Sequence, residues 1–107
     1  MATRALVSVP KVLRRGEVFE VRTTLAHAME TGYRRDSDGQ MLPRDIVRRL
    51  EVQLDGERVF AVDLHPAMAA NPYVAFPLRL QAGGALRIRW TGDNGFDHSE
   101  NVQLQMT

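Results

Sequence analysis

The 107-residue sequence contains no cysteine. Disulfide bonds, thiolate nucleophiles, iron–sulphur clusters and cysteine-ligated zinc or copper sites are therefore all excluded. The chain also cannot carry a substrate on a thiol of its own. The absence says little about the compartment, because proteins without disulfides occur in both the cytosol and the periplasm.

A strong net charge is also missing, since 14 basic residues stand against 13 acidic ones. Without a global electrostatic field, we expect no nucleic-acid partner and no attraction to anionic membranes. Three arginine pairs, which begin at residues 14, 34 and 48, could bind an anion locally. Exposed charges of this kind are usually solvated, so we interpret the pairs as ordinary surface.

Long apolar runs are absent as well. No stretch is long enough to span a membrane, and the apolar run near the N-terminus is too short and too interrupted for a secretory signal. Taken alone, these features lead us to expect a cytoplasmic protein. The apolar share of 44% and the charged share of 25% are those of a soluble globular domain, and we predict one domain over residues 1–107.

Apolar and polar residues alternate along much of the sequence, which is typical of half-buried β-strands. The pair Asp55-Gly56 predicts a tight hairpin turn, and Pro77 predicts that its strand lies at a sheet edge or contains a bulge. A long loop is expected over 27–43, and a short loop or single helical turn over 65–72. We predict an all-β, immunoglobulin-like sandwich of about seven strands. The expected strands lie near residues 4–9, 19–25, 50–54, 60–64, 74–80, 86–90 and 102–106.

Sequence motifs of the common enzyme classes are missing. There is no GxSxG, HExxH, Walker or GxGxxG pattern, and no acidic loop with calcium-site spacing. A hydrolase with His27 and Glu30 as acid and base would have no identifiable nucleophile. We therefore expect a protein without catalytic residues, resident metal or cofactor.

A copper site is the most specific metal hypothesis that the composition allows. Histidine and methionine are suitable ligands and need no cysteine. The same side chains often have structural roles, because methionine fills core gaps and histidine bonds to neighbouring carbonyls. The candidate ligands are His27, Met29, His65, Met68 and His98.

Two segments have a composition that suits protein recognition. The first, HAMETGYRRD over 27–36, combines a histidine, an acid, an aromatic residue and two arginines, and Tyr and Arg are enriched at interface centres. An ordinary loop whose tyrosine packs on the sandwich is an equally good interpretation. The second, DLHPAMAANPYVAF over 63–76, joins a strand to an edge strand, where a partner could add a strand of its own. The candidate partner-binding residues are His27, Met29, Glu30, Tyr33, Arg34, Arg35, Asp36 and Tyr73. We expect His65, Pro66, Asn71 and Pro72 to shape the turn of the second segment.

The same segments carry a resemblance to a known family. HAMETGYRRD, the run from Ile46 to Phe76 and WTGDNG over 90–95 resemble SoxZ, a subunit of the bacterial sulphur-oxidation carrier complex SoxYZ. The METG-aromatic-RRD and LHPA-x-AANP runs are long and correctly spaced. One departure is Ala28, where the family usually has proline after the histidine, which leaves the loop less rigid.

The resemblance implies an immunoglobulin-like sandwich that pairs with SoxY. In that family, the flexible C-terminal arm of SoxY ends in a glycine-rich motif with one cysteine, and this cysteine carries thiosulphate-derived sulphur between the Sox enzymes. The SoxZ-like chain would be the non-catalytic subunit that holds SoxY and presents surface to those enzymes. The resemblance also implies export to the periplasm with a signal-bearing SoxY, and self-association is possible when the chain is isolated. Within this hypothesis, we expect the interface to include the loop around Met29, Tyr33 and Arg34, with Tyr73 contributing.

Overall fold

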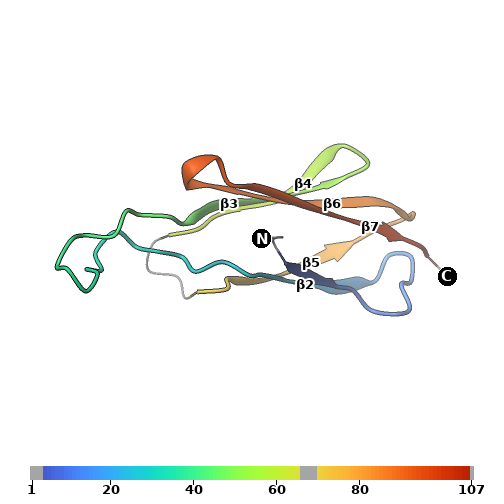
Figure 1. The fold of residues 1–107 in the computed structure, drawn as a ribbon. Helices are drawn as coiled ribbons and strands as arrows, with labels where there is room; N and C mark the ends of the chain where they lie inside the picture. Colours follow the sequence, from blue (N-terminus) through green and yellow to red (C-terminus); the bar gives the residue numbers. More distant parts are fainter. Residues whose placement is uncertain (1–3, 66–69, 107) are drawn as a thin grey trace.

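The computed structural model describes residues 4–65 and 70–106. Within these residues, seven strands form two antiparallel sheets that face each other as the layers of a sandwich (Figure 1). The predicted all-β sandwich is confirmed. This part of the chain has no helix long and apolar enough to cross a membrane. The elements are β1 (Ala5–Ser8), β2 (Val18–Leu25), β3 (Val47–Leu54), β4 (Glu57–Asp63), β5 (Tyr73–Arg79), β6 (Gly84–Gly92), the single turn η1 (Asp93–Gly95) and β7 (Asp97–Leu104).

The strand order is β1-β2-β5 in one sheet and β4-β3-β6-β7 in the other. The core lies between the sheets, because alternate residues of each strand point inward. On β3, Leu50 is fully buried and lies opposite Trp90 of β6. Phe60 of β4 stacks on Phe76 of β5, with 4.5 Å between the ring centroids. This aromatic pair joins the two sheets.

The hairpin between β3 and β4 forms where Asp55-Gly56 predicts it. Both residues have positive φ angles, 50° for Asp55 and 84° for Gly56, which the tight turn between antiparallel strands requires. The Asp55 carboxylate also accepts a hydrogen bond from the Ala85 N–H at 2.9 Å. The turn is therefore attached to the start of β6. Of the two positions predicted for Pro77, an edge or a bulge, the structure shows the edge, since β5 is the last strand of its sheet.

The connection between β2 and β3, residues 26–46, projects beyond the end of both sheets (Figure 1). Isolated β-bridges join Glu30 to Asp45 and Arg35 to Met41, so the connection is a narrow two-stranded structure. At its tip, the Asp36 carboxylate accepts hydrogen bonds from the backbone N–H groups at residues 38 and 40, at 2.9 and 3.0 Å. We call residues 26–46 the ribbon. The long loop expected over 27–43 is confirmed, and its bridges give it an ordered backbone.

Candidate functional site

His27 organises the root of the ribbon, and its side chain is only 9% exposed. Its Nδ1 accepts a hydrogen bond from the Met29 N–H at 3.0 Å, and its ring lies edge-on to Phe96. Because Nδ1 accepts this bond, the ring N–H is on Nε2. Nε2 lies 3.9 Å from the Asp45 carboxylate. His27 therefore fixes the direction in which the ribbon leaves the sandwich, and little of its ring is available to a partner.

Met29, predicted as a partner contact, is buried in the core instead. Its backbone is left-handed, with φ of 54°, and its sulphur accepts a hydrogen bond from the Val47 N–H at 3.3 Å. A flexible thioether suits such an irregular gap between a loop and a strand. Met29 thus attaches the ribbon to the first residue of β3 and has no surface to offer a partner.

Glu30 and Arg34 form an ion pair along the ribbon, with 2.6 Å between Oε1 and Nη2. The hydrogen bond from Arg34 holds the pKa of Glu30 below its usual value, against a smaller opposing effect of desolvation. Arg35 donates from Nη1 to the Gly39 carbonyl at 2.7 Å, which crosses the tip of the ribbon. These predicted site residues lie together, and their contacts support the shape of the ribbon.

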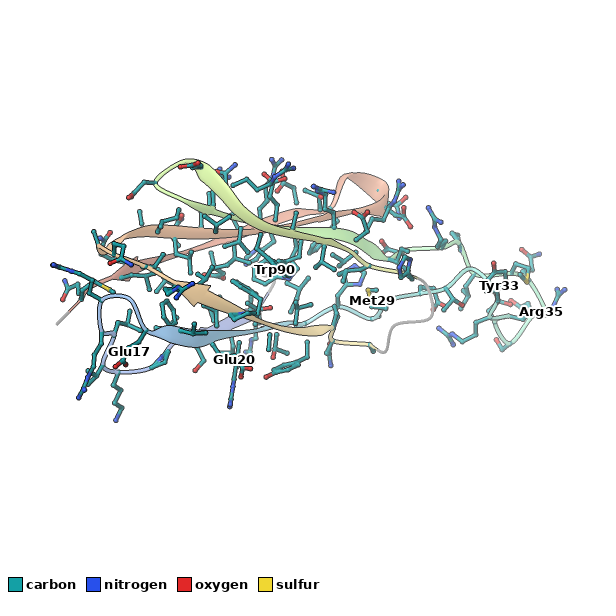
Figure 2. The ribbon with its side chains drawn as sticks, turned by 180° about the vertical axis from the view of Figure 1, so that it is seen from behind. Glu17, Glu20, Met29, Tyr33, Arg35 and Trp90 are labelled. Atoms are coloured by element: carbon teal, nitrogen blue, oxygen red, sulfur yellow. The ribbon has the colours of Figure 1, made fainter. Side chains whose placement is uncertain are left out.

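Tyr33 is the most exposed large hydrophobic residue of the described chain, at 80%. The sequence also allowed an ordinary loop whose tyrosine packs on the sandwich. That interpretation is wrong, because Tyr33 does not pack there. Figure 2 shows Tyr33 and Arg35 far out on the ribbon, whereas Met29 lies at its root. Met41, which pairs with Arg35 across the ribbon, is 47% exposed. Sequence reasoning missed Met41, because only the bridge to Arg35 shows that it lies on the ribbon beside the predicted residues.

Asp93 in η1 anchors the returning side of the ribbon, and sequence reasoning did not identify this role. Its carboxylate accepts two hydrogen bonds from Arg44, at 2.8 and 3.0 Å, and a third from the Ile46 N–H at 3.2 Å. The hydrogen bond from Arg44 is the main reason that the pKa of Asp93 lies below its ordinary value. The ribbon is therefore held on both sides, by His27 and Met29 on one and by Asp93 on the other.

The sequence also shows to which protein family the chain belongs. Residues 7–103 match the family model described as sulphur oxidation protein SoxZ. The chain belongs to the SoxZ family. The family assignment predicted from the three sequence segments is thereby confirmed, and it places the chain in the sulphur oxidation system. No curated protein matches the sequence significantly.

Solved structures share the fold of this SoxZ-family chain at low sequence identity. A superoxide reductase (neelaredoxin) from Ignicoccus hospitalis is 16% identical, with a TM-score of 0.72, and the match covers 98% of this chain and 82% of that one. A protein described as a candidate superoxide reductase from Thermotoga maritima is 14% identical, with a TM-score of 0.71, over 96% and 85% of the two chains. At such identities the likeness establishes the sandwich fold alone.

The second segment of the SoxZ-family chain meets the root of the ribbon at Asn71. This residue has a left-handed φ of 54°, and its side-chain oxygen accepts a hydrogen bond from the His27 N–H at 2.9 Å. Its own N–H donates to the His27 carbonyl at 2.6 Å. These two hydrogen bonds join Asn71 to the backbone of His27. Of the other residues predicted to shape this turn, Pro72 accepts a hydrogen bond at its carbonyl from the Leu25 N–H. His65 is exposed, and Pro66 lies outside the described residues.

Asn71→Ala is expected to destabilise the chain by about 1–2 kcal/mol, since the side-chain hydrogen bond to the His27 backbone is lost and alanine resists a left-handed backbone. Thermal unfolding followed by circular dichroism measures the change. Asn71→Gly is the matched control, because glycine keeps the backbone angle and loses only the side-chain bond. Equal stability of Asn71→Ala and the wild type would contradict the assigned role.

The copper hypothesis finds little support in the arrangement of its ligands. Among residues 4–65 and 70–106, no three His, Asp or Glu side chains gather where they could hold a metal. His98 bonds to Glu100 at 2.8 Å, and Nδ1 of His27 is occupied by Met29. Met68 lies outside the described residues. The hydrolase hypothesis is equally unsupported, since the carboxylate of Glu30 is bound by arginine.

Proposed function

We propose that this SoxZ-family chain is the non-catalytic scaffold subunit of a SoxYZ-type sulphur carrier. It binds SoxY, whose C-terminal cysteine carries thiosulphate-derived intermediates between the Sox enzymes. The observation that carries the proposal is the family match over residues 7–103. The absence of cysteine agrees with it, because covalent sulphur carriage must then belong to the partner.

The ribbon is the surface that we assign to this partner. Tyr33 and Met41 expose apolar surface there, and the adjacent Arg34 and Arg35 add directional hydrogen-bond donors. Tyr and Arg are the residue types that most often dominate binding energy at protein interfaces. The internal bridges and ion pairs hold the ribbon in shape before a partner arrives, which lowers the entropy lost on binding.

The predicted residues have two roles in this proposal. Tyr33, Arg34, Arg35 and Asp36 provide or border the contact surface of the ribbon. The other three residues support the ribbon. His27 and Met29 form hydrogen bonds at its root, and Glu30 forms an ion pair with Arg34 along its length. Tyr73 lies in β5, on the outer face of the three-stranded sheet, where it is exposed and belongs to a surface separate from the ribbon. The complex would act in the periplasm, where the chain arrives together with a signal-bearing SoxY.

The test is direct binding between the purified chain and a SoxY-type protein with its C-terminal cysteine. We expect a one-to-one complex with a dissociation constant in the micromolar range or below, measured by calorimetry and by co-elution on size exclusion. A cysteine-to-serine SoxY variant should bind equally well, because the carrier thiol lies on a flexible arm outside the interface. No complex at micromolar concentrations of folded proteins would reject the proposal.

A further inference from the structure

A pocket of about 540 Å³ lies at the end of the four-stranded sheet from which the ribbon projects (Figure 1). Three arginines line it, Arg44 from the ribbon and Arg48 and Arg49 from β3. The other lining residues include the ends of β4 and β6 and contain one acid, Asp63. We call this the arginine pocket. The sequence led us to expect ordinary surface at the pair Arg48-Arg49, whereas the structure places both side chains at one pocket.

A β-bulge brings these two adjacent arginines to the same pocket. Val47 and Arg49 pair with two consecutive residues of β6, so Arg48 is an extra residue on β3. In a regular strand, adjacent side chains point to opposite faces of the sheet. Here Val47 and Leu50 are fully buried, and the two arginines between them both reach the surface. Bulges re-aim side chains in this way and are frequent beside active sites.

Arg48 is the arginine of the pocket that is free to bind a ligand. Its side chain is exposed and forms no hydrogen bond or ion pair with any residue among 4–65 and 70–106. Its charge contributes to the low pKa of Asp93, but the Asp93 carboxylate is bonded to Arg44 and to a backbone N–H. A guanidinium carries five N–H donors and keeps its charge at any ordinary pH. An anion in the pocket could use all of these donors.

Ion pairs hold the other two arginines in place and leave them with donors to spare. Arg44 donates to Asp93 from Nε and Nη2, at 2.8 and 3.0 Å, which leaves the N–H groups of Nη1. Arg49 donates from Nη1 to Asp63 at 3.0 Å, and its Nε lies 3.6 Å from Glu51, which leaves Nη2. Asp63 is 70% exposed, so water screens the repulsion that its charge exerts on an anion.

We propose that the arginine pocket binds a sulphur oxyanion through a terminal SO₃ group. The planar guanidinium matches a pair of such oxygens and binds them through charge-assisted hydrogen bonds. The identity of the anion rests on the proposed function, because thiosulphate and the group that it leaves on the SoxY cysteine both end in negatively charged oxygens. The ribbon, which we assign to SoxY, supplies Arg44, so a SoxY molecule bound there lies beside the pocket.

The first test uses the chain alone with sodium thiosulphate as the probe. Backbone amide shifts are followed in a two-dimensional NMR titration at constant ionic strength, with chloride as the balancing anion, so that general screening does not change. We expect saturable shifts at residues 44–49, 63–64 and 91–92. Arg48→Gln should bind thiosulphate at least about tenfold more weakly, because charge-assisted hydrogen bonds are lost. Arg79→Gln, at an exposed position of β5 outside the pocket, is the matched control and should bind as the wild type does.

Asp63→Asn should change the affinity in the opposite direction. The substitution removes the only acid among the described residues that line the pocket, and it frees Nη1 of Arg49. Thiosulphate should therefore bind about twofold to fivefold more tightly. The three substituted side chains are all exposed, so the melting temperatures of the variants should match that of the wild type. A change in binding then reports on the pocket and not on folding.

The second test distinguishes free thiosulphate from the group carried by SoxY. SoxY with a thiosulphonate on its cysteine is compared with unmodified SoxY in calorimetric titrations of the wild type and of Arg48→Gln. If the carried group enters the pocket, the wild type binds loaded SoxY several-fold more tightly than unmodified SoxY, and Arg48→Gln removes the difference. If only the free anion binds there, both forms of SoxY have the same affinity, and thiosulphate still binds to the chain alone.

Three results would each overturn the proposal. They are the absence of saturable thiosulphate binding together with equal affinity for the two forms of SoxY, unchanged thiosulphate binding by Arg48→Gln, and weaker binding by Asp63→Asn. The first test needs no SoxY, so its outcome stands even if the chain forms no complex with SoxY. Conversely, a SoxY complex without any oxyanion binding would reject the arginine pocket as a ligand site and leave the scaffold function intact.

Discussion

Trp90→Ala is expected to lower the free energy of unfolding by about 3–5 kcal/mol. Trp90 is 1% exposed and lies opposite Leu50 on β3, and its ring also approaches His98, with 5.9 Å between the centroids. Removing the indole leaves a cavity that the surrounding strands can fill only in part. A domain of this size is usually stable by only about 5–15 kcal/mol, so the substitution removes a large share of the total.

Urea unfolding followed by far-ultraviolet circular dichroism measures this loss, because Trp90 is the only tryptophan and its fluorescence disappears with it. Trp90→Phe keeps an aromatic ring and should lose only about 1–3 kcal/mol, which keeps the test informative if the alanine variant fails to fold. Val12→Ala is the control at an exposed position and should change stability by less than about 0.5 kcal/mol. A Trp90→Ala variant as stable as Val12→Ala would contradict this description of the core.

Alternation made the sandwich predictable from the sequence. A strand with one buried face repeats with a period of two, and Val21, Leu50 and Ile88 are buried as that period requires. Turn chemistry was equally informative, because few residues tolerate the positive φ angles found at Asp55 and Gly56. These signals are local, so a single sequence reveals them. The order of strands in the two sheets depends on contacts between distant segments and could not be read in this way.

The root of the ribbon shows where local signals were insufficient. Met29 and Asn71 both adopt positive φ angles, which sequence patterns rarely predict for residues other than glycine. The bond between Asn71 and His27 spans 44 positions, and the bonds between Arg44 and Asp93 span 49. Composition favoured a recognition role for residues 27–36, which remains a prediction, but it could not distinguish the residues that support the ribbon from those that it exposes.

Tyr33→Ala is expected to weaken SoxY binding by about 2 kcal/mol, or about 30-fold, as is typical of an aromatic residue at the centre of an interface. The expectation depends on the 80% exposure of Tyr33 in the free chain, which leaves its ring available to a partner pocket. The same exposure means that the substitution should not change thermal stability, because few core contacts are lost. Calorimetric titration with a SoxY-type protein, together with a melting curve, separates the two effects.

Tyr33→Phe and Val59→Ala complete this experiment. Phenylalanine keeps the ring area, so its affinity should stay within about tenfold of the wild type, and the difference measures what the hydroxyl contributes. Val59 is an exposed apolar residue on β4, outside the ribbon, and its substitution should leave binding unchanged. A Tyr33→Ala variant that binds SoxY as tightly as the wild type would remove the ribbon from the interface. SoxY would then have to bind another surface of the sandwich.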